Sequence, residues 1–166
     1  MRTHPKAAVL LAATVLAGAA GATAAQAAPT AAPAPSACRP ANHLAKITRA
    51  PGSAGHRHYR VTLTAPRGYE PCRLAGSPAD VRFPAHGSAL ALSPGRYGDQ
   101  RTAVVLGPGH PVHFDIQVPD TRHGTAADGA SFTLRAPGGE IPGTSFADGP
   151  LTVAPGTLVG PVRRGA

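Results

Sequence analysis

The chain has 166 residues, including 20 Gly and 19 Pro, and only 4% of it is aromatic. Its 16 Lys and Arg residues against 8 Asp and Glu residues give a formal net charge of +8 at pH 7. This composition excludes a long-helix bundle and a doubly wound α/β core, because large apolar side chains are too few to cover either. A chain of this length predicts one domain.

Residues 1–27 have the pattern of a signal peptide. A basic start is followed by an uncharged run rich in Ala, Leu and Val, and Ala25 and Ala27 are the small residues that signal peptidase requires. The alternative is a membrane anchor, since the uncharged run is nearly long enough to span a bilayer. The cleavage pattern favours export, so we expect cleavage between Ala27 and Ala28, a secreted or cell-wall location, and no membrane span afterwards.

A linker and a cysteine pair follow. Residues 28–37 are rich in Ala and Pro and predict an extended linker. Cys38 and Cys72 are the chain's two cysteines, and in the oxidising compartment that export implies we expect a disulfide between them. Closing such a loop stabilises a domain by about 3 to 4 kcal/mol in the chain-entropy model. The alternative is metal ligation, but two cysteines without Cys-x-x-Cys spacing favour the bridge.

Short strands are predicted over the rest of the chain. Residues 58–64 and 112–118 alternate strictly between apolar and polar side chains, which indicates half-buried antiparallel strands. Weaker strand patterns lie at 44–48, 81–83, 89–92, 103–106, 131–135 and 151–153. Pro-Gly dipeptides between them indicate turns. We therefore expect an all-β sandwich of seven to eight short strands over residues 38–162, and a flexible tail at 163–166.

The order of several short motifs resembles one protein family. Cys38, the strand at Tyr59, residues 71–78 (PCRLAGSP) and residues 106–109 (LGPG) follow one another as in the domain of unknown function 4232 family, found in exported actinobacterial proteins. The resemblance implies an immunoglobulin-like antiparallel β-sandwich outside the cell or in the cell envelope, and it implies no reaction. Members of this family often carry a second cysteine pair in the C-terminal half. The chain departs from that pattern, because no cysteine follows Cys72.

The chain carries no catalytic motif that we can identify. Residues 143–147 (GTSFA) fail the last position of the nucleophile elbow, and Lys46 has no serine at the spacing of a Ser-x-x-Lys pair. The acidic residues lie mostly beside turns, and no motif joins two of them as a glycosidase requires. We therefore expect a non-catalytic binding or structural module without a cofactor.

A basic cluster predicts one possible partner. Arg57, His58 and Arg60 lie within four residues, and arginine binds phosphate well, so these residues predict a site for an acidic cell-wall polymer. The alternative is that the arginines reflect a GC-rich genome and have no partner. Export and the lack of interleaved aromatic residues argue against nucleic-acid binding.

Histidines give a weaker candidate, a surface metal site. His56 and His58 begin one strand, and His113 and Asp115 share the polar face of another. If these strands brought His58 and His113 together, the cluster would suit Zn or Cu(II). The alternative is histidines scattered over a solvated face, and none of the spacings is a known metal motif, so we expect no bound metal.

The signal-peptide pattern makes a direct prediction. The exported protein should begin at Ala28, because Ala25 and Ala27 satisfy the cleavage rule. Intact mass measurement of the exported species tests this. An uncleaved chain or a lipid-modified N-terminus would contradict it.

Overall fold

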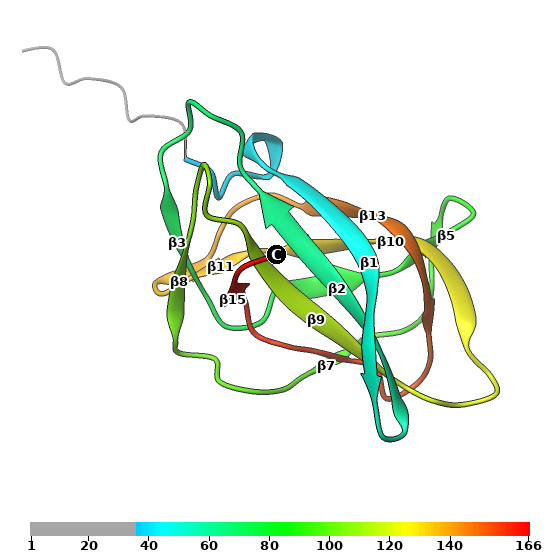
Figure 1. Cartoon of the computed structure of the whole chain (residues 1–166). Helices are drawn as coiled ribbons and strands as arrows, with labels where there is room; N and C mark the ends of the chain where they lie inside the picture. Colours follow the sequence, from blue (N-terminus) through cyan, green and yellow to red (C-terminus); the bar gives the residue numbers. More distant parts are fainter. Residues whose placement is uncertain (1–35) are drawn as a thin grey trace, which may run out of the picture. The chain divides into compact units, whose positions relative to one another are not determined.

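A computed structural model describes residues 36–166 (Figure 1). The predicted signal peptide at 1–27, the cleavage site at Ala27 and Ala28, and most of the linker at 28–37 lie outside the described residues. Residues 36–166 form β-strands and loops, with one 3-10 turn, η1 (Pro40–Asn42), and no α-helix. The all-β prediction is confirmed. No helix in this part of the chain is long and apolar enough to cross a membrane.

The strands are more numerous than the sequence predicted, and several are longer than their predicted segments. They are β1 (Leu44–Ser53), β2 (His56–Thr64), β3 (Cys72–Ala75), β4 (Ala79–Arg82), β5 (Pro84–Ala85), β6 (Ser88–Ala89), β7 (Gly95–Arg96), β8 (Ala103–Leu106), β9 (Val112–Pro119), β10 (Thr125–Thr133), β11 (Arg135–Ala136), β12 (Gly139–Glu140), β13 (Ser145–Val153), β14 (Leu158–Val159) and β15 (Arg163–Arg164). The two strictly alternating segments form β2 and β9. Each weaker pattern overlaps a strand, although 89–92 does so only at its first residue.

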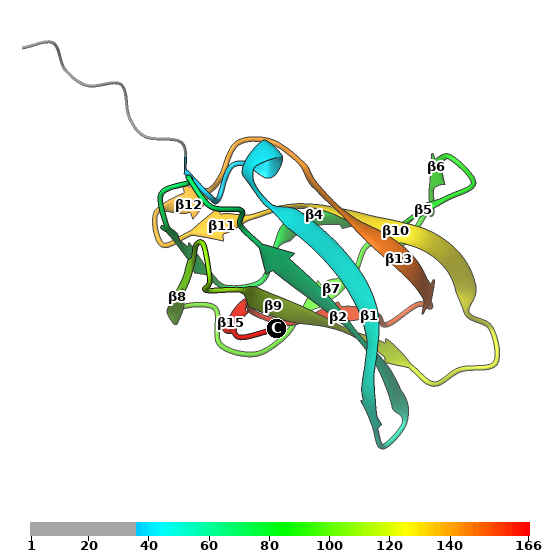
Figure 2. The same cartoon turned by 45° about the horizontal axis from the view of Figure 1, so that its top comes forward.

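Nine of the strands form one curled sheet. Its order is β4-β10-β13-β1-β2-β9-β14-β7, with β15 added to β9 (Figure 2). Most neighbours are antiparallel, as predicted, but β1 pairs with β13 in parallel and β14 pairs with β7 in parallel. The sheet is therefore mixed rather than wholly antiparallel, because β1 lies beside a late strand that runs in the same direction.

The curl of the sheet encloses the hydrophobic core. The rings of Phe114 in β9 and Phe132 in β10 meet edge to face, with centroids 5.1 Å apart and an interplanar angle of 79°. β9 and β10 are not neighbours in the sheet. This contact therefore joins two distant strands of the sheet across the core. Because side chains alternate along a strand, every second residue of β2 and β9 points inward. The fully buried members from these two strands are Val61, Leu63, Val112, Phe114, Ile116 and Val118.

The C-terminal residues differ from the flexible tail that was predicted for 163–166. β15 pairs with the start of β9, and the Gly165 amide donates to the Pro111 carbonyl oxygen at 3.0 Å. The sequence pattern missed β15 because two residues carry no alternation of their own. Backbone pairing with His113 and Val112 of β9 holds these two residues in a strand.

The predicted disulfide is confirmed. Cys38 and Cys72 are bonded, with Cα atoms 5.8 Å apart and a separation of 34 positions in the sequence. Beside the bridge, the Ala37 amide donates to the Glu70 carbonyl oxygen at 2.9 Å. The bridge thereby ties the segment before β1 to the start of β3.

The bridge should contribute a large part of the domain's stability. Reduction, or the double substitution Cys38→Ser and Cys72→Ser, is expected to lower the free energy of unfolding by about 3 kcal/mol, because the closed loop restricts the unfolded chain. Denaturant unfolding with and without reductant measures this difference. The double variant is the control, since reductant should not change it further. Full alkylation of the native protein without reductant would show that the bridge does not form.

Candidate functional site

The outer face of β2 and β9 carries most of the candidate residues. Inward-pointing apolar side chains alternate with outward-pointing polar ones on both strands. The outward residues face one another in the antiparallel register as Thr62 with His113, Arg60 with Asp115, and His58 with Gln117. The structure therefore brings together Arg60, Asp115 and His113 from the sequence candidates.

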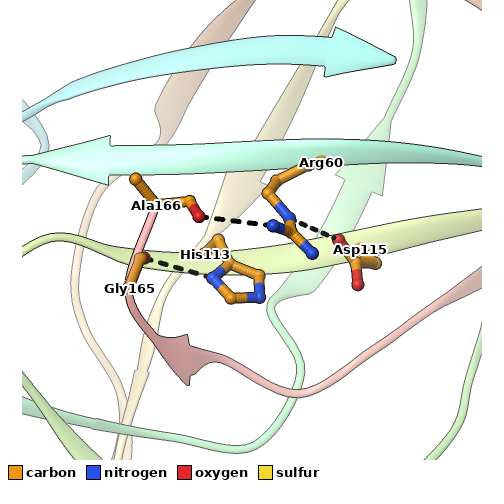
Figure 3. Close-up of polar contacts among 5 residues, drawn as sticks. All are labelled: Arg60, His113, Asp115, Gly165 and Ala166. Atoms are coloured by element: carbon orange, nitrogen blue, oxygen red, sulfur yellow. Dashed lines mark hydrogen bonds and ion pairs between the residues drawn. The ribbon is translucent and has the colours of Figure 1, made fainter. Parts of the chain in front are cut away.

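Arg60 is held by two partners in this face (Figure 3). Its Nε donates to Oδ1 of Asp115 at 3.1 Å, and its Nη1 donates to the carbonyl oxygen of Ala166 at 3.3 Å. The side chains of Arg60 and Asp115 are 34% and 19% exposed. A half-buried, hydrogen-bonded pair of this kind neutralises the charge of Arg60 within the protein.

His113 holds the same C-terminal segment. Its ring is buried, and Nδ1 lies 3.1 Å from the carbonyl oxygen of Gly165. A carbonyl oxygen only accepts hydrogen bonds, so Nδ1 carries the proton in this contact. Arg60 and His113 together fasten residues 165–166 onto β9.

Tyr97 joins this cluster electrostatically. Burial raises the pKa of the Tyr97 phenol, the negative charge of Asp115 raises it further, and Arg163 lowers it. The ring packs against Gly160, where an added Cβ would lie 2.8 Å from the phenol oxygen. Asp115 therefore acts on both Arg60 and Tyr97.

Arg57 does not share this face. It is an odd-numbered residue of β2, like the buried Tyr59, so it points away from Arg60. Its Nε lies 3.5 Å from Oδ1 of Asp120, an ion pair whose arginine side chain is 24% exposed. This contact is electrostatic only, because Nε and Nη2 of Arg57 make no hydrogen bond in the structure. The predicted cluster of Arg57, His58 and Arg60 is therefore divided between two faces of the sheet.

The candidate metal residues lie apart. His58 is opposite Gln117 and His113 is opposite Thr62, a separation of four strand positions, or about 13 Å at 3.3 Å per residue. His58 Nε2 lies 2.8 Å from Ser53 Oγ, and His56 Nδ1 lies 3.2 Å from the Ala54 carbonyl oxygen. Among residues 36–166, no three His, Cys, Asp or Glu residues gather in a way that would hold a metal ion.

Most arginines of the described residues are exposed and outside both ion pairs. The two ion pairs use the part-buried Arg57 and Arg60. The exposed arginines are Arg39, Arg49, Arg67, Arg73, Arg82, Arg96, Arg101, Arg122, Arg163 and Arg164. Together with the exposed Lys46, these arginines carry positive charge that lies outside both ion pairs.

A buried histidine that the sequence analysis did not single out links the N-terminal segment to β13. His43 is 7% exposed, with Nδ1 3.0 Å from the Ala37 carbonyl oxygen and Nε2 3.1 Å from Ser145 Oγ. Burial lowers the pKa of His43, and the backbone contacts oppose this. No local pattern marks this residue, because its partner Ser145 is 102 residues away.

Asp115→Asn should destabilise the protein by about 1 to 2 kcal/mol, because it leaves Arg60 half-buried without its charged partner. Urea unfolding measures the loss. Asp120→Asn is the matched control: the Asp120 side chain is 67% exposed, so its ion pair with Arg57 should contribute less than about 1 kcal/mol. Equal losses of stability in the two variants would contradict the larger stabilising role of the Arg60–Asp115 pair.

Stability should fall as the pH drops through the ordinary His pKa of 6.5, because the unfolded chain then binds a proton that buried His43 resists. The stability that neutral His43 contributes is complete above pH 6.5. It is lost as the pH falls toward the lowered pKa of His43 in the folded protein, at up to about 1.4 kcal/mol per pH unit. Unfolding measured across this range tests the sign. His43→Gln should flatten the dependence, whereas the exposed-site control His110→Gln should keep it.

Comparison with known proteins gives one match. The family model described as Domain of unknown function (DUF4232) matches residues 38–157, which include the disulfide and most of the main sheet. No curated protein and no solved structure matches the chain. The resemblance inferred from the order of the motifs is confirmed, and the chain belongs to the DUF4232 family.

Proposed function

We propose that this chain is an exported, non-catalytic binding module whose partner is an anionic polymer outside the cell. The signal-peptide pattern supports export, and the Cys38–Cys72 bridge suits an oxidising compartment. The observation that carries the anionic partner is the set of ten exposed arginines outside the ion pairs of the described residues. Exposed guanidinium groups bind phosphate through two parallel hydrogen bonds.

In this proposal the polar cluster on β2 and β9 has a structural role rather than a catalytic one. Arg60 and Asp115 neutralise each other, and His113 donates to a backbone carbonyl oxygen. A general acid or base needs a proton-carrying atom that can reach a substrate. These three side chains are engaged in holding the C-terminal segment.

The polymer should contact the exposed arginines more than Arg57 and Arg60. Asp120 and Asp115 already form ion pairs with those two residues. A phosphate group that approached either of them would be repelled by the neighbouring carboxylate. This expectation differs from the site that the sequence alone predicted at Arg57, His58 and Arg60.

Binding of the exported protein to immobilised polyphosphate tests the proposal. The logarithm of affinity should fall linearly with the logarithm of salt concentration, with a slope that decreases by about one for each phosphate contact removed. Arg163→Ser with Arg164→Ser should reduce the slope, and Arg57→Ser with Arg60→Ser should leave it nearly unchanged.

Each result bears on a different part of the proposal. A wild-type protein that passes through the column at low salt would overturn the anionic partner and leave the arginines as a product of composition. A larger effect of the Arg57 and Arg60 substitutions would return the site to the face that the sequence predicted.

A further inference from the structure

A groove lies beside the disulfide, at the end of the domain where residue 36 enters. Its volume is about 900 Å³, within the usual size of a site for a small organic ligand. Apolar side chains make most of its walls, among them Pro40, Pro137, Ile141 and Pro142. Among residues 36–166, its only ionisable lining side chains are Arg39 and Arg73, which are both exposed and belong to neither ion pair.

Three segments that are far apart in the sequence form these walls and are fastened to one another. The disulfide joins the segment before β1 to the start of β3. The Ile141 amide donates to the Leu134 carbonyl oxygen at 2.8 Å and closes the β11–β12 hairpin. Gly143 passes directly beneath Pro40, since an added Cβ would lie 2.9 Å from the proline Cγ. The groove is therefore preformed.

The disulfide also holds the two positive charges near each other. Arg39 and Arg73 each follow a bonded cysteine by one residue. Consecutive Cα atoms are 3.8 Å apart, so the two arginine Cα atoms lie within about 13 Å of each other. Both side chains are long and end in planar guanidinium groups, so together they can bind one small anion.

We propose that this groove binds a single-chain amphiphile with an anionic head group, with the chain against the proline and isoleucine wall and the head group between Arg39 and Arg73. The charge of the lining favours an anion, because no acidic side chain from the described part of the chain lines the groove. The apolar wall favours this ligand over a phosphate polymer, because a phosphate polymer has no hydrocarbon chain to bury against it. The inference goes beyond the proposed function and does not require it.

Calorimetric titration of the exported protein with dodecanoate, below its micelle concentration, tests the proposal. Affinity should rise about two- to fourfold for each methylene added between octanoate and dodecanoate, because each methylene leaves water. Acetate should not bind measurably, and the uncharged dodecyl maltoside should bind at least about tenfold more weakly than dodecanoate, because it cannot pair with the arginines.

Arg39→Ser with Arg73→Ser should weaken dodecanoate binding at least about tenfold. Arg49→Ser with Arg122→Ser is the matched control, because it removes two exposed positive charges that do not line the groove. The control variant should bind as the wild type does. Both pairs lie on the surface, and unfolding measurements verify that each variant folds.

Three results would overturn the groove assignment: no binding of dodecanoate, equal binding of dodecanoate and dodecyl maltoside, or equal effects of the two double variants. Polyphosphate retention is measured separately. If retention persists while dodecanoate fails to bind, the groove is refuted and the proposed function is not. If dodecanoate binds in the expected pattern while the protein is not retained on polyphosphate, the groove stands and the polymer partner is refuted.

Discussion

Parallel pairing between β1 and β13 joins two groups of mainly antiparallel strands into one sheet. β13, β10 and β4 lie on one side of this junction, and β1, β2, β9, β14 and β7 lie on the other. The backbones approach so closely that a Cβ at Gly149, whose φ is +141°, would lie 2.6 Å from the Ile47 carbonyl oxygen. Glycine is needed there. The junction lets β10 fold over to face β9, so the contact between Phe114 and Phe132 depends on it.

Covalent and polar contacts secure the end of the domain that carries the disulfide. The disulfide and the amide of Ala37 fasten the segment before β1 to residues 70–72, and the ring of His43 fastens it to Ser145 in β13. A small domain with few large apolar residues gains much of its stability from such a bridge. The same contacts fix the walls of the groove, so stability and a candidate binding site share their physical basis here.

Local charge density and available charge are different properties of this surface. Arg57 and Arg60 lie close together in the sequence with His58 between them, yet these two arginines carry the ion pairs of the described residues. Their partners are Asp115, in the middle of β9, and Asp120, directly after the strand. The exposed arginines elsewhere are scattered in sequence, and the disulfide, together with the hydrogen bond from the Ala37 amide, brings the segments of Arg39 and Arg73 together.

The sequence by itself determined the features that depend on neighbouring residues. Strict alternation predicted β2 and β9, because a strand repeats every two residues. A lone cysteine pair predicted the bridge, and the order of motifs predicted the family. Tertiary structure alone decided the parallel junction, the pairing of β15 with β9 and the partners of Arg57 and Arg60. These features depend on the register between distant strands, and register follows from how whole inner faces pack together, which no local pattern of residues encodes.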